Sequence, residues 1–190
     1  EPYLLSVNDK GNAVIGIQGT SPPALQEVDE GMMIQAIEEA KKSVKERSFL
    51  SARVGAVIVN AKGEIVGRAN NKGGHLLHAE LFALIDIYKD LIKKSGISEK
   101  YIDKLKEIEK KSHQHNIKIE PLYEEVVVLL KEIDTALGSK EANEVTLYVT
   151  LQPCDDCASL IAQMAESKIL RIKRVVYGVS AVNPRHAVSI

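Results

Sequence analysis

The stretch VTLYVTLQPCDDCASLIAQMAESKILRIKRVVYGV, residues 145–179, decides the fold. It opens with a run of β-branched and apolar residues over 145–151, which is typical of a strand buried on both faces. Pro153 stops that strand, and the acidic pair that follows suits the first turn of a helix running to about Lys168. A second apolar run over 172–179 predicts the last strand. Because a helix joins these two strands, we expect them to be parallel neighbours in one sheet.

The remaining elements of the predicted domain lie upstream of this stretch. An apolar run over 54–59 predicts another buried strand, and 65–66 resumes as its partner after a turn at 60–63. One helix should begin near His78, and Asp29 is predicted to cap another helix with an apolar stripe. Together these elements predict a three-layer α/β/α sandwich. Its sheet should be mixed and mostly five-stranded, with helices on both faces.

The chain is expected to form one domain with an extension and an insertion. Residues 1–28 predict an N-terminal extension, made of a hairpin and a Pro-containing linker. Residues 29–190 predict the main domain, interrupted at about 89–144 by a segment dense in Lys and Glu. Apolar residues at helical spacing predict a pair of helices there, with a solvated charged face. This insertion could cover the active site, bind a partner or dock another domain, and we expect it to be peripheral.

The overall composition excludes several classes of protein. The chain has 190 residues, of which 45% are apolar and 27% charged, as in ordinary globular proteins. A net charge of -1 gives no electrostatic footprint for generic binding to DNA or membranes. Aromatic residues are sparse and Trp is absent, so no stacking surface for single-stranded nucleic acid is indicated. No membrane-span or signal-peptide pattern is visible, so we expect a cytoplasmic protein.

Two short motifs carry the chemistry, and each lies at the start of a predicted helix. They are His78-Ala79-Glu80 and Cys154-Asp155-Asp156-Cys157. The cysteine motif alone also fits a redox pair, two packed reduced thiols or half of a structural zinc site. A structural site needs four protein ligands, however, and the chain has 2 cysteines. One His and two Cys would leave the fourth position for water, which is the pattern of a catalytic zinc.

This pattern predicts different roles for the metal and for Glu80. Zinc lowers the pKa of a bound water towards about 7, which makes hydroxide available near neutral pH. Glu80, two residues from His78, would move protons without binding the metal. The two cysteines lie at a helix N-terminus, where the dipole favours thiolates.

The motifs resemble the zinc-dependent deaminases of the cytidine deaminase superfamily, whose signature is His-x-Glu followed later by Pro-Cys-x-x-Cys. The strand at 54–59, Tyr-Val-Thr-Leu at 148–151 and Asn183-Pro184 are most similar to the pyrimidine deaminase domain of riboflavin biosynthesis. The tight spacing of the two cysteines is instead similar to that of tRNA adenosine, guanine and deoxycytidylate deaminases.

The resemblance implies a hydrolase that deaminates a cyclic amidine, meaning an amino-substituted nucleobase, nucleoside or nucleotide. Zinc-activated hydroxide would attack the carbon bearing the amine, Glu80 would shuttle the protons, and ammonia would leave. Asn71 and Ala79 are implied as substrate contacts, although Asn71 also suits a turn. The implied cofactor is Zn²⁺, with the ligands His78, Cys154 and Cys157.

Two alternative functions stay open. A tRNA or DNA substrate is favoured by the cysteine spacing and a small basic cluster formed by Arg171, Lys173 and Arg174, whereas the near-neutral charge disfavours it. A non-catalytic zinc-stabilised interaction module would use the insertion as its binding surface, and the intact Glu80 speaks against it. As partners we expect a small-molecule substrate and no membrane. A second copy of the chain or another protein should bind through the insertion.

Overall fold

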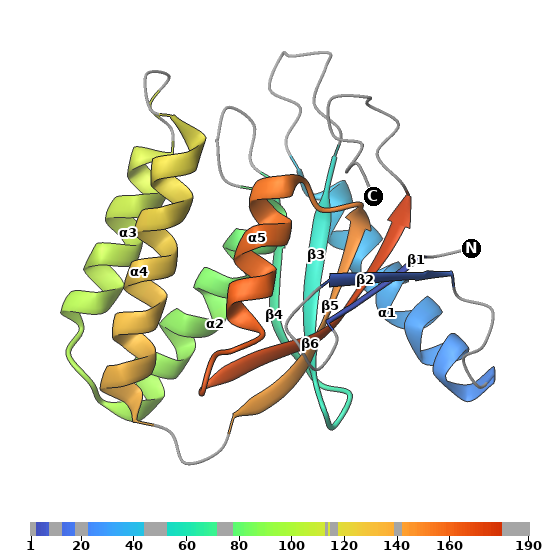
Figure 1. Cartoon of the computed structure of the whole chain (residues 1–190), viewed down its shortest axis with the longest axis horizontal. Helices are drawn as coiled ribbons and strands as arrows, with labels where there is room; N and C mark the ends of the chain where they lie inside the picture. The colour runs from blue at the N-terminus through green and yellow to red at the C-terminus, as the bar shows by residue number, and fades with distance from the viewer. Residues whose placement is uncertain are drawn as a thin grey trace.

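The computed structural model describes residues 3–7, 13–17, 23–43, 53–71, 78–112, 114, 118–138 and 142–179. Asn183 and Pro184, which contributed to the resemblance, lie outside these ranges. The described residues form a mixed sheet with helices on both faces (Figure 1). The predicted α/β class is therefore confirmed. None of the described helices combines the length and apolar character that a membrane crossing requires.

The described strands form one sheet in the order β2-β1-β6-β5-β3-β4. Strands β5 and β6 are parallel, as the helix between them predicted, and β3 pairs antiparallel with both β4 and β5. The prediction of mostly five strands is not confirmed, because the N-terminal hairpin joins the sheet by pairing with β6. The strand bounds are β1 (Tyr3–Val7), β2 (Ala13–Ile17), β3 (Gly55–Asn60), β4 (Ile65–Asn70), β5 (Asn143–Leu151) and β6 (Leu170–Val179).

The described helices cover the two faces of the sheet unequally. On one face, α1 packs on Val57, Tyr148 and Val176. The other face is covered by α2 and α5, with α3 and α4 packed outside them (Figure 1). The helix bounds are α1 (Pro23–Lys41), α2 (Ala79–Ser95), α3 (Lys100–Lys111), α4 (Ile119–Leu137) and α5 (Asp155–Met164).

Helix α1 begins six residues before the predicted cap, at Pro23. A proline is favoured at the first helical position, because its missing N–H would have no intrahelical partner there. Asp29 is therefore inside α1, and the continuous helix crosses the predicted boundary between 28 and 29. Asp29 is 1% exposed, accepts a 2.6 Å hydrogen bond from the Tyr148 hydroxyl and pairs with Arg174. This buried contact ties α1 to β5 and β6.

The α3–α4 segment is helical as predicted, and its two helices pack on the outer side of α2 and α5. That the segment is peripheral to the fold stays a prediction. Its charged residues pair across helices, as Lys89 of α2 does with Glu109 at 2.7 Å and Lys104 with Glu132 at 3.1 Å. The apolar residues of the segment belong to the same core cluster as α2, α5 and the sheet. Those buried in this cluster include Leu105, Ile108, Leu122, Val126, Leu130 and Ile133.

Gly55, at the start of β3, allows α1 to approach the sheet closely. A Cβ at this position would lie 2.0 Å from Ala36 O and 2.4 Å from Ala40 N, both backbone atoms of α1. We expect Gly55→Ala to displace α1 and lower the free energy of unfolding by ~1–3 kcal/mol in urea denaturation.

The matched control for this substitution is Gly31→Ala on the exposed side of α1, where a Cβ meets nothing within 4 Å. Alanine is the better helix former, so the free energy of unfolding of Gly31→Ala should rise by about 0.8–1.0 kcal/mol. If the two substitutions changed the free energy of unfolding equally, this would contradict the close approach of α1 to the sheet at Gly55.

Candidate metal centre

The first half of the centre lies at the start of α2. His78 is the N-cap residue, with extended backbone angles, and its carbonyl accepts the Phe82 N–H at 3.2 Å. This conformation turns the chain sharply into the helix, so the imidazole stands at the helix end and Glu80 lies in the first turn.

The second half lies at the start of α5 and repeats this arrangement. Cys154 is the N-cap residue, and its carbonyl accepts the Ala158 N–H at 2.8 Å. Cys157 lies in the first turn and is completely buried. Both thiols therefore stand at the positive end of the α5 dipole, which favours their thiolate forms.

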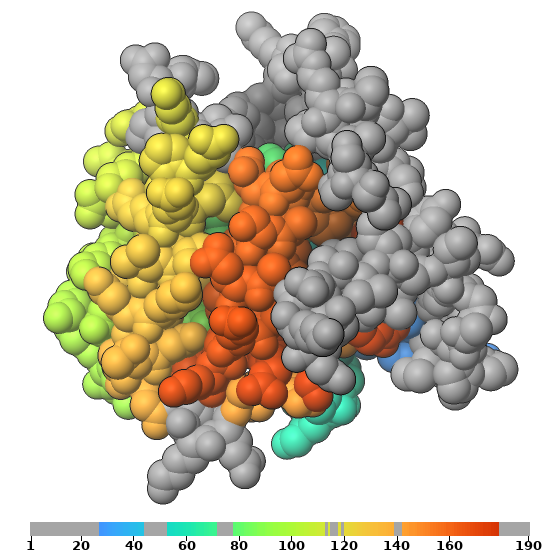
Figure 2. Space-filling view, in the orientation of Figure 1, coloured from blue at the N-terminus to red at the C-terminus, as the bar shows by residue number. Residues whose placement is uncertain are grey.

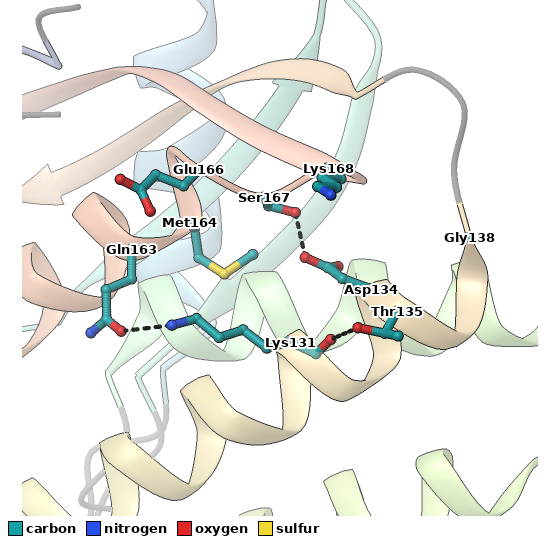
Figure 3. A pocket seen from close by; sticks show the side chains of 9 residues that line it. All are labelled: Lys131, Asp134, Thr135, Gly138, Gln163, Met164, Glu166, Ser167 and Lys168. Atoms are coloured by element: carbon teal, nitrogen blue, oxygen red, sulfur yellow. Dashed lines mark hydrogen bonds between the residues drawn. The ribbon is translucent and has the colours of Figure 1, made fainter. Parts of the chain in front are cut away.

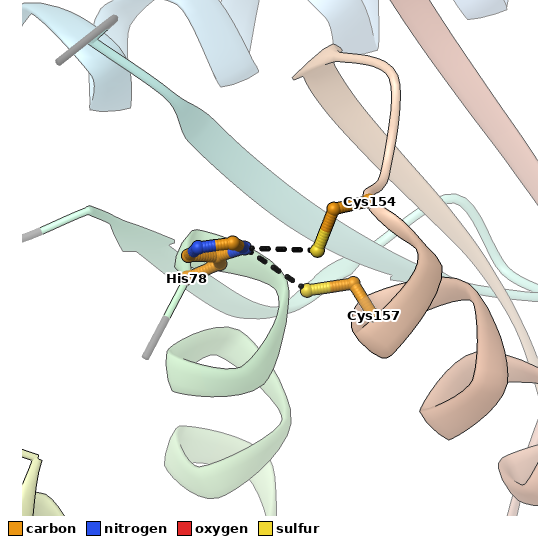
Figure 4. Close-up of side chains that lie close together, drawn as sticks. All are labelled: His78, Cys154 and Cys157. Atoms are coloured by element: carbon orange, nitrogen blue, oxygen red, sulfur yellow. Dashed lines mark hydrogen bonds between the residues drawn. The ribbon is translucent and has the colours of Figure 1, made fainter. Parts of the chain in front are cut away.

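The two helix starts bring the three predicted ligands together (Figure 4). His78 Nδ1 lies 3.3 Å from Cys154 Sγ and 3.4 Å from Cys157 Sγ. All three donor atoms lie within 4.8 Å of one another. Donors around a tetrahedral zinc are separated by roughly 3.5–3.8 Å, given metal distances of about 2.0–2.3 Å. One nitrogen and two sulfurs at this spacing fit zinc.

The charges of the three side chains are strongly coupled. A hydrogen bond from Cys157, together with His78, lowers the pKa of the Cys154 thiol to about 4 despite burial. The contact with Cys154 and burial raise the pKa of Cys157. The hydrogen bond with Cys154 also raises the pKa of His78, against the opposing effect of burial. The lowered pKa of Cys154 favours the thiolate, which is the form of cysteine that binds metals.

Glu80 lies beside this cluster without belonging to it. Its side chain is 3% exposed, and its Oε2 has no hydrogen-bond partner among the described residues. Burial raises the pKa of Glu80, and the charge of His78 opposes that shift. A buried carboxylate oxygen without a partner is costly, so it points to a polar group that binds there.

Tyr123 of α4 is a residue of the centre that the sequence did not reveal. Its hydroxyl lies 3.3 Å from Cys157 Sγ. Its ring meets the His78 ring edge to face, with centroids 6.4 Å apart. Burial raises the pKa of Tyr123, so the hydroxyl keeps its proton. In the sequence this residue adjoins the apolar stripe of α4, and no motif marks it.

Asn71 and Ala79, the two predicted substrate contacts, each make contacts within the fold. Asn71 follows β4, and its Oδ1 accepts the Val54 N–H at 2.8 Å, which joins the end of β4 to the start of β3. Ala79 is completely buried, with its side chain in the main core. Substrate binding by either residue stays a prediction.

A separate cavity of about 510 Å³ lies between the C-terminal ends of α4 and α5 (Figure 3). Asp134 in its wall accepts hydrogen bonds from Tyr88 at 2.6 Å and Ser167 at 2.7 Å. Lys131 likewise reaches Gln163 at 3.5 Å. These contacts hold α4 to α2, to α5 and to the segment before β6. None of the predicted site residues lines this cavity, so we assign it a structural role.

Comparison with known proteins identifies the family. Residues 26–179 match the family model of the cytidine and deoxycytidylate deaminase zinc-binding region. The chain belongs to this family, and the match includes the three donor residues and Glu80. The family and the donor set therefore agree on zinc as the metal of this centre.

Individual relatives match shorter parts. A tRNA-specific adenosine deaminase of Bacillus subtilis is 28% identical over 150 residues, covering 79% of this chain and 61% of the relative. One from Rickettsia felis is 37% identical over 59 residues, covering 31% of this chain and 37% of the relative. The chain thus spans less than two thirds of these relatives. A solved structure of Acinetobacter baumannii RibD matches with 25% identity and a TM-score of 0.34, covering 72% of this chain and 26% of RibD.

Proposed function

We propose that the protein is a zinc-dependent hydrolytic deaminase of an amino-substituted nucleobase, nucleoside or nucleotide. The observation that carries this proposal is the buried Oε2 of Glu80, which lacks a described partner beside a His/Cys/Cys donor set. A metal held by three protein ligands leaves a position for water, and a carboxylate next to it can exchange protons with that water.

The chemistry divides between the ligands and Glu80. His78, Cys154 and Cys157 would hold zinc, which supplies a Lewis acid that makes water nucleophilic near neutral pH. Glu80 would transfer one proton of the water to the ring nitrogen of the amidine and the other to the departing amino nitrogen. A C–O bond forms, the C–N bond breaks, and the products are a carbonyl and ammonia. The raised pKa of Glu80 suits a group that must both accept and donate protons.

The charges around the centre favour a small substrate over a polynucleotide. A cavity of about 200 Å³ beside Tyr123 is lined by Glu120, Glu124 and Asp156, which would repel a phosphate backbone. The basic cluster proposed for nucleic acid is largely neutralised, because Arg174 pairs with Asp29 and Lys173 with Glu144. A phosphate would therefore have to compete with these carboxylates for the two side chains.

A nucleic-acid deaminase is the second candidate. It is favoured by the relatives named tRNA-specific adenosine deaminases and by the two-residue spacing between the cysteines. The predicted contact of α3 and α4 with a second copy or another protein stays a separate prediction.

The proposal is tested by measuring ammonia release from the zinc-loaded chain. The panel comprises free bases, nucleosides, nucleotides, single-stranded oligonucleotides and tRNA, with Glu80→Gln as the inactive control. We expect release from a small amino-heterocycle. Release from oligonucleotides or tRNA alone would favour the second candidate. Protein that holds zinc but deaminates nothing on the panel would instead support the non-catalytic zinc-stabilised module.

A further inference from the structure

Tyr123 touches two of the three metal ligands from outside the ligand set. Its hydroxyl contacts Cys157 Sγ at 3.3 Å, and its ring packs edge-on against His78. The side chain is 5% exposed and Cys157 is completely buried, so water does not compete for this contact. Neither His78 nor the cysteine motif lies near Tyr123 in the sequence.

The direction of this hydrogen bond follows from the chemistry of the ligand. A cysteine that binds zinc does so as a thiolate, which carries no proton and can only accept. A phenol is protonated at neutral pH and can donate. When Cys157 serves as a ligand, Tyr123 is therefore the donor and the sulfur the acceptor.

Helix α4 is fixed firmly enough to hold this donor in place. Tyr88 of α2 and Ser167 both donate to Asp134 of α4, which anchors the C-terminal part of the helix. Val126 and Leu130 of α4 are buried in the main core. In the space-filling view, α4 and α5 lie side by side along the molecule (Figure 2).

We propose that Tyr123 is a positioning residue of the metal centre, which donates a hydrogen bond to the Cys157 thiolate and sets how strongly that sulfur binds the metal. This inference rests on the proposed ligand role of Cys157. Partners behind the ligands orient them and tune the metal, and their loss typically costs 10–100-fold in affinity. The α3–α4 segment therefore contributes a side chain to the centre.

The test is Tyr123→Phe, which removes the hydroxyl and keeps the ring. Zinc affinity is measured by chelator competition, and we expect it to fall roughly 10–100-fold. In the cobalt-substituted protein, the thiolate-to-metal charge-transfer band should move to longer wavelength, because a thiolate without its donor is easier to oxidise. The d–d bands should keep their tetrahedral pattern.

The matched control is Tyr148→Phe, which also removes a buried, hydrogen-bonded hydroxyl, but one that contacts Asp29 of α1 on the opposite face of the sheet. It should lower the free energy of unfolding while leaving zinc affinity and the charge-transfer band close to those of the unmodified protein. The proposal would be overturned if both variants had the same zinc affinity and charge-transfer band, or if Tyr123→Phe changed neither quantity.

A second measurement covers the case in which Tyr123→Phe fails to fold. Site-specific replacement of Tyr123 with 3-fluorotyrosine keeps the shape and strengthens the donor, so the charge-transfer band should move to shorter wavelength. An unmoved band would overturn the proposal. None of these readouts requires deamination, so absence of ammonia release would count against the proposed function alone.

Discussion

Glu80→Gln is expected to reduce deamination by roughly 10²–10⁴-fold while zinc remains bound at one ion per chain. Glutamine has nearly the same size, so it fits the buried position that Glu80 occupies at 3% exposure. It cannot carry a proton between water and the leaving nitrogen. Ammonia release and elemental analysis of the same preparation measure the two quantities.

The control is Asp86→Asn, which neutralises an exposed carboxylate on the same helix. It should leave both activity and zinc content unchanged. Full activity in Glu80→Gln would refute the proton-transfer role. Loss of zinc in that variant would identify Glu80 as a ligand or as a support of the ligands.

Cys154→Ala should nearly abolish zinc binding and destabilise the fold. This change removes one of the three predicted ligands. Loss of a residue that only hydrogen-bonds to a ligand lowers metal affinity by up to ~100-fold, so the zinc affinity of Cys154→Ala should fall by more than that. Metal binding energy contributes to folding, and a hundredfold loss of affinity removes ~2.7 kcal/mol when zinc is in excess. Chelator competition and thermal unfolding with and without zinc measure both effects.

Ser159→Ala is the control on the same helix, because this residue is exposed on α5. It should bind zinc as the unmodified chain does. If Cys154→Ala kept its zinc and its stability, the metal centre would have to lie elsewhere and the proposed function would fail with it.

The strands, helices and ligand motifs that short stretches of sequence determine were predictable from the sequence. The apolar runs and the Pro153 stop predicted β5, α5 and β6, and the helix between the strands predicted their parallel pairing. The meeting of His78, Cys154 and Cys157 was predictable because His and Cys are the side chains that zinc prefers, and both motifs stand at helix starts.

The contacts that the sequence did not reveal join residues far apart in the chain. Asp29 resembles a helix cap in its local surroundings, but it is buried against Tyr148, 119 residues away. Tyr123 lies 34 residues before Cys157, on a helix whose charged composition suggested a solvated surface. The positions of Asp29 and Tyr123 in the fold depend on tertiary packing, which overrides the local preferences of the sequence.

The separation of the two halves of the metal centre has a consequence for the order of events during folding. His78 lies 76 residues before Cys154 and 79 before Cys157, with α3 and α4 in between. Among the three predicted ligands, only the two cysteines are close together in an unfolded chain, because closing the long loop to His78 costs entropy. With these three residues as ligands, complete coordination would require the N-terminal ends of α2 and α5 to meet, so we expect metal capture to be a late, non-local step of folding.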